Sequence, residues 1–152
     1  MPLGGRMKQT LAGVVSIFIF AASSGYAGGK GDSKFPGQSG GYLKKDPIVE
    51  NRVNIYDRKG SLEGYTRKDP ISDDRWNIYD SKGRQKGSVK QDPIREDRKN
   101  IYDSKGRQEG YLRKDHLFDD RTNVYDKSGL QEGYLEKDPL VKDKTKIYRI
   151  PK

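Results

Sequence analysis

The feature that most constrains the fold is a period of 23 residues, which runs from residue 41 to residue 148 without insertion or deletion. A glycine recurs at Gly41, Gly64, Gly87, Gly110 and Gly133. An aspartate and a tyrosine return with the same spacing, at Asp46, Asp69, Asp92, Asp115 and Asp138 and at Tyr56, Tyr79, Tyr102, Tyr125 and Tyr148. Self-similarity at a fixed period is typical of repeat architectures, in which each unit buries its apolar face against its neighbours.

Composition argues against a conventional globule. Of the 152 residues, 35% are charged and 31% hydrophobic, so little material is available for a large shared core. Such a balance approaches that of disordered chains. The regular return of tyrosine, isoleucine and glycine indicates instead an ordered array.

The first 27 residues have the pattern of a signal peptide. Arg6 and Lys8 precede an apolar run from Leu11 to Ala22, and Gly25 and Ala27 are small residues at the two positions that a signal peptidase recognises. The run is shorter than the roughly 20 residues that span a bilayer, so a retained membrane anchor is the weaker alternative. We therefore expect cleavage after Ala27, a flexible Gly/Ser-rich segment over residues 28–40, a repeat domain over residues 41–152, and a periplasmic or extracellular location.

Each repeat has the sequence pattern of a β-hairpin. In the unit from Asn77 to Lys90, the segment Asn77–Tyr79 has strand propensity, and Asp80 and Gly83 occupy the first and fourth positions of a tight turn. Glycine in the fourth position can take a positive φ and form the bulge that lets a type I turn join twisted strands. Four hairpins are thus predicted, with turns at residues 57–60, 80–83, 103–106 and 126–129.

The returning strand, for example Gln108–Arg113, contains the repeated glycine. We expect each such glycine to lie where a tyrosine ring of the opposite strand packs onto the backbone. Asp69-Pro70 should end the preceding strand, because proline cannot donate to a ladder, and Ile71 should return the connection to the core. Stacking would then bury Ile55, Tyr56, Tyr65 and Ile71 together.

The two ends of the array are complementary halves of a repeat. It opens with an unpaired second strand, Gly41–Lys44, and closes with an unpaired first strand, Lys146–Ile150. Paired together they would complete a fifth hairpin without a turn and remove exposed edges. The predicted fold is all-β, with five hairpin units in a small closed, propeller-like ring; the alternative is an open hairpin solenoid.

The layout of Asn100-Ile101-Tyr102-Asp103, Gly106 and Gly110-Tyr111 resembles that of short bacterial β-hairpin repeats. These include choline-binding cell-wall repeats and small flower-like or propeller-like repeat proteins. The resemblance implies an exported, non-catalytic binding or structural module. Choline-binding repeats use pairs of tryptophans, whereas this chain has only Trp76, so the resemblance does not extend to that ligand.

Nothing in the sequence requires a metal or a catalytic centre. Asp69, Asp73, Asp74 and Asp80 could offer oxygen ligands to calcium, but their spacing is not that of a calcium loop, and turn capping with arginine pairing explains them. His116 is the single histidine and stands where the other repeats have proline. We expect no enzyme and no cofactor.

Charge favours an anionic partner. Loss of Arg6 and Lys8 with the signal would change the formal charge from +9 to +7 (9 − 2). A basic exported protein suits an anionic polysaccharide, a cell-envelope surface or a protein, and nucleic acid is the weaker interpretation.

Candidate ligand-binding residues are the aromatics Trp76, Tyr65, Tyr111 and Tyr134 and the cations Arg67 and Arg113. If the position of Trp76 points outward, Trp76 is the main exposed aromatic contact; the favoured interpretation is that it covers a gap beside Ser88, which replaces a repeat tyrosine in the next unit. Self-assembly through the terminal strands is the alternative function, and a closed ring would be a monomer.

Overall fold

The computed structural model describes residues 38–150, all of whose regular secondary structure is antiparallel β. The signal peptide expected over residues 1–27, and residues 28–37 of the expected flexible segment, lie outside the described residues. The ten strands are β1 (Gln38–Lys45), β2 (Arg52–Tyr56), β3 (Leu62–Lys68), β4 (Arg75–Asp80), β5 (Gln85–Gln91), β6 (Arg98–Asp103), β7 (Gln108–Lys114), β8 (Arg121–Asp126), β9 (Gln131–Lys137) and β10 (Lys144–Arg149). Strand β1 begins three residues before the expected start of the repeat domain.

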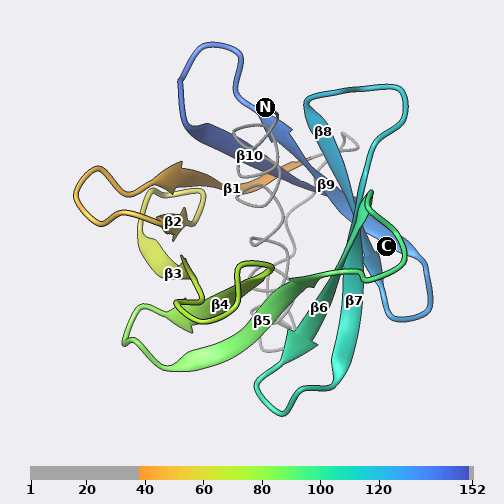
Figure 1. Cartoon of the computed structure of the whole chain (residues 1–152). Coiled ribbons are helices and arrows are strands. Elements are labelled where there is room, and N and C mark those ends of the chain that lie inside the picture. The colour runs from red at the N-terminus through yellow and green to blue at the C-terminus, as the bar shows by residue number, and fades with distance from the viewer. Residues whose placement is uncertain (1–37, 151–152) are drawn as a thin grey trace, which may run out of the picture.

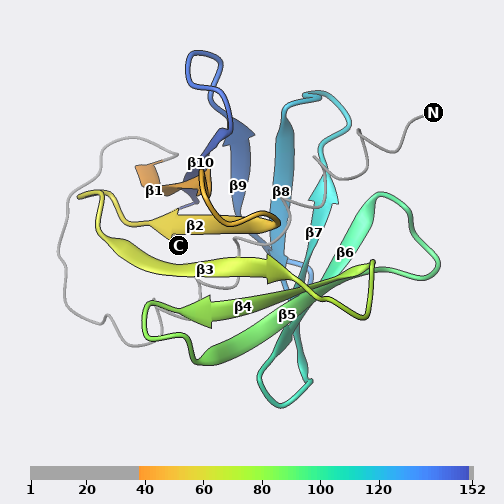
Figure 2. The same ribbon diagram turned by 60° about the vertical axis from the view of Figure 1, so that its left-hand side comes forward.

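The ten strands close into a single barrel in the order β1-β10-β9-β8-β7-β6-β5-β4-β3-β2 (Figure 1). The first and last strands pair with each other, with Leu43 opposite Thr145 and Tyr42 opposite Lys146. The closed ring of five hairpins is therefore confirmed, and the open solenoid is not formed. Neighbouring hairpins are hydrogen-bonded to one another, so the ring is one continuous barrel rather than a set of separate blades (Figure 2).

The four predicted turns are present, and the glycine determines their geometry. The N–H of Gly83 donates to the carbonyl of Asp80 at 3.0 Å, and Gly83 has φ of 78°. The Asp80 carboxylate accepts the N–H groups of Lys82 and Arg84, both at 2.9 Å. A register shift follows between Ile78 and Tyr79, which is the expected bulge. The same hydrogen bond and positive φ recur at Gly60, Gly106 and Gly129.

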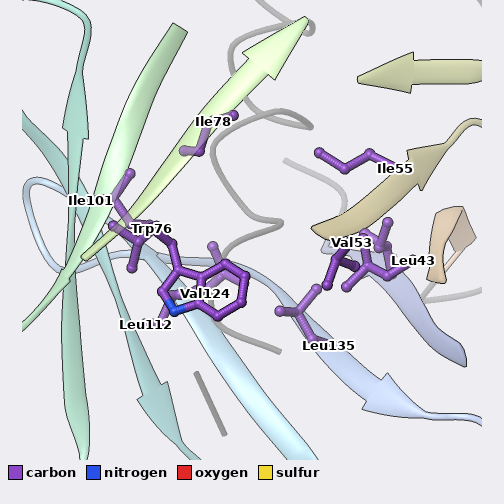
Figure 3. Close-up of a cluster of buried hydrophobic side chains, with 11 residues drawn as sticks. Leu43, Val53, Ile55, Trp76, Ile78, Ile101, Leu112, Val124 and Leu135 are labelled. Atoms are coloured by element: carbon purple, nitrogen blue, oxygen red, sulfur yellow. The ribbon is translucent and has the colours of Figure 1, made fainter. Parts of the chain in front are cut away.

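The barrel is filled by side chains that alternate inward along each strand (Figure 3). Two equivalent positions of the repeat, such as Ile78 and Val89, are aliphatic in nearly every unit, and their side chains are buried. A third inward position is occupied by different residue types in the five repeats, namely Val53, Trp76, Lys99, Thr122 and Thr145.

The expectation that Ile71 returns the connection to the core was wrong. Its side chain is 95% exposed, and its counterparts Ile48, Ile94, Leu117 and Leu140 are exposed to a similar degree. The cause is the preceding aspartate, because the Asp69 carboxylate accepts the N–H groups of Ile71 at 2.9 Å and Ser72 at 3.1 Å. Its other oxygen accepts Asn77 Nδ2 at 2.8 Å. The connection is thus held to the strand by Asp69, without burial of Ile71.

The repeated glycines are needed for space, but a tyrosine ring is not what approaches them. A Cβ at Gly110 would overlap the backbone carbonyl oxygen of Tyr125, and one at Gly133 would overlap that of Tyr148. The tyrosine rings lie half-buried on the outer wall instead of in the core with Ile55. Glycine at these positions therefore permits close approach between two successive hairpins.

Thr66 is an exception inside the core. It is fully buried at a position where other repeats have leucine or valine, and its Oγ1 has no hydrogen-bond partner among residues 38–150. Because an unsatisfied buried hydroxyl costs about 1–3 kcal/mol, Thr66→Val should raise the free energy of unfolding by about 1 kcal/mol. Urea unfolding would measure this, and an unchanged or lower stability would contradict it.

Candidate functional site

Stacked tyrosines are the main feature of the outer wall. In four of the five repeats, a tyrosine of the return strand stacks on a tyrosine of the next strand, with ring centroids 4.7–5.0 Å apart. A cation covers the other face of the first ring, as Arg52 does over Tyr65 and Arg98 over Tyr111, each at 3.9 Å from the centroid. We call this arrangement the cation–tyrosine–tyrosine stack. It buries both faces of the first ring.

Like charges oppose each other across the strands next to these stacks. Arg52 lies opposite Arg67, and Arg75 lies opposite Lys90. The same register pairs Arg98 with Arg113 and Lys44 with Lys144, whereas Arg121 faces Glu136. Directly opposed like charges destabilise a sheet, so four such pairs at one level of the barrel are not explained by stability.

Carboxylates neutralise part of this positive charge. Arg113 Nε lies 2.8 Å from Asp97 Oδ2, and Arg121 Nη2 lies 3.2 Å from Glu136 Oε1. Four of the five first-strand cations also lie within 4.0 Å of the repeated aspartate that precedes them, as Arg52 does of Asp46 at 3.5 Å.

At this level of the wall, three exposed cations have no carboxylate partner among the described residues. Lys44, Arg67 and Lys90 form no ion pair with any carboxylate of the described residues. They lie at equivalent positions on β1, β3 and β5, which are alternate strands of the barrel. Alternate strands are about 10 Å apart, so these three residues form a regularly spaced row on one side of the wall. We call Lys44, Arg67 and Lys90 the cation row.

The structure separates the six residues that the sequence suggested as a ligand site. Arg67 is exposed and belongs to the cation row, whereas Arg113 is ion-paired with Asp97. Tyr65, Tyr111 and Tyr134 lie on the outer wall, but each ring is covered by a cation and by a second tyrosine, which leaves only its edge accessible.

Trp76 is not on the surface. It is 3% exposed and lies among the aliphatic side chains of the core (Figure 3), so the interpretation of Trp76 as an exposed ligand contact was wrong. Ser88 belongs to the opposite face of the sheet, because it pairs with Tyr102 whereas Trp76 pairs with the buried Val89. Trp76 therefore does not cover space left by Ser88 either.

Lys44 and Lys90 were not identified from the sequence as candidate ligand residues. They are separated from Arg67 by one period in each direction, so the repeat itself contained the signal. What the sequence could not show is that the fourth member, Arg113, is paired with Asp97, because Asp97 lies on the preceding connection, 16 residues away.

The repeated aspartates act as structural clamps. Backbone hydrogen bonds from Val49 and Ile48 lower the pKa of Asp46, and a bond from Asn54 Nδ2 acts in the same direction. Asp69, Asp92 and Asp115 have equivalent partners, and Asp138 receives Lys146 Nζ at 3.3 Å in place of an asparagine. Within residues 38–150, no cluster of three or more acidic or histidine residues has a metal-binding arrangement.

His116 and a small cavity are two further places with titratable groups. His116 is exposed in the connection between β7 and β8. The cavity has a volume of about 60 Å³ and is lined by the inward-facing Lys99, Thr122 and Thr145 together with carboxylates of two connections. Burial lowers the pKa of Lys99 to about 7.

No family model and no curated protein matches the chain. Among solved structures, the chain is similar to a protein from Arabidopsis thaliana determined by X-ray crystallography, with 13% identity and a TM-score of 0.46. The match covers 78% of this chain and 82% of that one. No helix among the described residues is long and apolar enough to cross a membrane.

Proposed function

We propose that this chain is a non-catalytic binding module for an anionic partner at the cell envelope, with an anionic glycan favoured over a protein. The observation that carries the proposal is the cation row on a wall that already opposes like charges across its strands. These cations face like charges, which costs stability, and they have no carboxylate partners. Their charge is therefore available to attract an external polyanion.

Regular spacing favours a repeating ligand. Lys44, Arg67 and Lys90 recur on alternate strands, so a linear polyanion lying across β1 to β5 can contact all three. The stacked tyrosines fix the wall beside them and offer their edges rather than free ring faces. Charge, rather than sugar stacking on these tyrosines, therefore supplies the recognition.

The test measures binding of the full chain to polygalacturonate, a carboxylated polysaccharide, with neutral dextran as the ligand control. The variant Lys44→Gln, Arg67→Gln, Lys90→Gln should bind roughly tenfold more weakly, because three exposed charge contacts each contribute about 0.2–1 kcal/mol. The matched control Lys82→Gln, Lys105→Gln, Lys127→Gln removes the same charge from exposed turn residues and should bind as the parent chain does.

Binding should also weaken steeply as salt is added. Equal losses of affinity for polygalacturonate in the two triple variants would mean that only the net charge of the protein matters. Salt-insensitive binding would contradict an electrostatic interface. Either result would overturn the assignment to the cation row.

The alternative, self-assembly through the terminal strands, requires a change in the barrel. Both β1 and β10 are paired on two sides within the chain, so assembly would need one of them to exchange with a second molecule. Growth in light scattering with protein concentration would support that route, and a constant monomer mass would exclude it.

A further inference from the structure

The small cavity lies at the end of the barrel that carries the connections between β5 and β6 and between β7 and β8. Lys99, Thr122 and Thr145 line it from the first strands of three successive hairpins. Each faces the interior, because its partner across the ladder is a buried leucine, namely Leu112, Leu135 and Leu43. We call this space the Lys99 cavity.

Lys99 differs from the other two lysines of the cavity in having no carboxylate partner among residues 38–150. Lys114 lies 3.7 Å from Asp119, and Lys137 lies 3.2 Å from Asp120. The Lys99 side chain forms no hydrogen bond with the described residues either. It remains partly accessible, so the cavity connects its amine with the solvent.

Burial without a partner makes the Lys99 amine nucleophilic at neutral pH. Its pKa is lowered to about 7, so about half of the molecules carry the neutral amine at that pH, whereas an exposed lysine is almost entirely protonated. Only the neutral amine has a lone pair that can attack a carbonyl carbon, and desolvated lysines form Schiff bases in this way. The cavity therefore holds a reactive amine within reach of a small molecule.

The size and charge of the Lys99 cavity restrict the partner. A volume of about 60 Å³ admits a group of roughly four or five non-hydrogen atoms, since one water needs about 10–15 Å³. Once Lys99 is neutral, carboxylates outnumber ammonium groups in the lining, which contains Glu96, Asp97, Asp119 and Asp120 against Lys114 and Lys137. They remain in excess even when the ion pair of Asp97 with Arg113 is counted. This balance disfavours an anion and favours a small neutral electrophile.

Two threonine hydroxyls add a polar requirement. The side chains of Thr122 and Thr145 line the same cavity as Lys99 and form no hydrogen bond with the described residues. A hydroxyl group next to the carbonyl group of the partner can hydrogen-bond to them, because a hydroxyl both donates and accepts. A small hydroxyaldehyde meets the requirements of size, charge and polarity together.

We propose that Lys99 forms a Schiff base with a small neutral hydroxyaldehyde that enters the Lys99 cavity. The lone pair on Lys99 Nζ forms a bond to the carbonyl carbon, and a proton passes from the nitrogen to the former carbonyl oxygen, which gives a carbinolamine. That oxygen then leaves as water with the remaining amine proton, and a C=N bond is formed without any oxidant or reductant. The site lies inside the barrel and shares no residue with the cation row, so it does not depend on polyanion binding.

The test treats the full chain at pH 7 with glycolaldehyde and sodium cyanoborohydride, which reduces the Schiff base to a stable secondary amine. Peptide mass spectrometry then measures the rate of modification at each lysine. Lys99 should react roughly tenfold faster than Lys105 in an exposed turn, because its neutral fraction is roughly a thousandfold larger although a less basic amine is a weaker nucleophile. Equal rates at the two residues would overturn the proposal.

Two controls separate the cavity from the basicity of the amine. Pyridoxal, an aldehyde too large for the cavity, should show no preference for Lys99, and a preference as large as that of glycolaldehyde would contradict selection by the cavity. The variant Thr122→Val, Thr145→Val should slow the reaction of Lys99 with glycolaldehyde and not with acetaldehyde, which has no hydroxyl group. Equal slowing for both aldehydes would contradict contact with the threonines. The comparison with pyridoxal uses the parent chain, so it tests the cavity even if the variant fails to fold.

Discussion

Replacing Lys99 by methionine should raise the free energy of unfolding by about 2–4 kcal/mol at pH 6. Lys99 points into the barrel at the position where other repeats have valine, tryptophan or threonine, and burial lowers its pKa to about 7. Lys99 has no ion pair with a carboxylate of residues 38–150: at the same cavity, Asp97 is paired with Arg113, and Asp119 and Asp120 are largely exposed to solvent. Methionine keeps the length of the side chain and removes its charge.

The lowered pKa of Lys99 also predicts how the free energy of unfolding changes with pH. The ordinary lysine pKa of 10.5 applies to the unfolded chain, so between pH 7 and pH 10.5 the unfolded state binds a proton that the folded state does not. Stability of the parent chain should therefore rise with pH across this window, and the penalty from Lys99 is fully present below pH 7. The advantage of Lys99→Met should shrink correspondingly as the pH approaches 10.

Urea unfolding at several pH values between 6 and 9.5 measures this difference. Lys105→Met removes an equal charge from an exposed hairpin turn, so its free energy of unfolding should stay within about 0.5 kcal/mol of the parent value. If the parent and Lys99→Met curves run parallel over the whole range, then Lys99 is not a buried charge in the folded barrel.

The period predicted more of the fold than the composition did. Because the turn aspartate and glycine recur every 23 residues, the sequence located four hairpins and showed that the two terminal strands complement each other. The closed topology follows from those two observations, since a strand left unpaired at each end of a ring-forming array finds its partner in the other end.

The direction of individual side chains was harder to predict. Trp76 is two residues from Ile78 on one strand, so strand alternation alone places it in the core. Other repeats have polar residues at this position, namely Lys99, Thr122 and Thr145. They are accommodated inside because this end of the barrel contains a cavity, which no sequence pattern shows.

The candidate site was recoverable only in part, for a related reason. Arg67 and Arg113 are equivalent by sequence, yet an ion pair with Asp97 neutralises only the second. The stacks, likewise, depend on register: Tyr65 lies beside Tyr79 because β3 pairs with the next hairpin as well as with its own first strand. Pairing between hairpins therefore determines which faces of the rings remain accessible.

Pairing between hairpins also underlies the second large expected effect. The substitution Gly110→Ala should lower the free energy of unfolding by about 3 kcal/mol or more. Gly110 lies on β7, and the carbonyl oxygen that a Cβ would overlap belongs to Tyr125 on β8, the first strand of the next hairpin. This carbonyl is part of a strand paired on both sides, so it cannot move aside without loss of ladder hydrogen bonds.

Gly106→Ala is the matched control. Gly106 has φ of 78° in the turn of the same hairpin, and a Cβ there would meet no atom within 4 Å. Its cost should be limited to the left-handed backbone conformation, about 1–2 kcal/mol. Urea unfolding of the two variants compares the steric overlap in Gly110→Ala with the strained backbone in Gly106→Ala. Equal decreases in the free energy of unfolding would contradict the steric explanation.

Hydrogen exchange in Gly110→Ala would show where the barrel weakens. Amides shared by β7 and β8 should lose protection first, while those within the hairpin of β6 and β7 keep theirs. The same close approach occurs at Gly87, at Gly133 and at Gly41, where β1 meets β2 next to the closing strand pair. At four of the five repeated positions, glycine therefore lets neighbouring strands of successive hairpins approach closely enough to form a continuous barrel, which explains why this residue returns with the period.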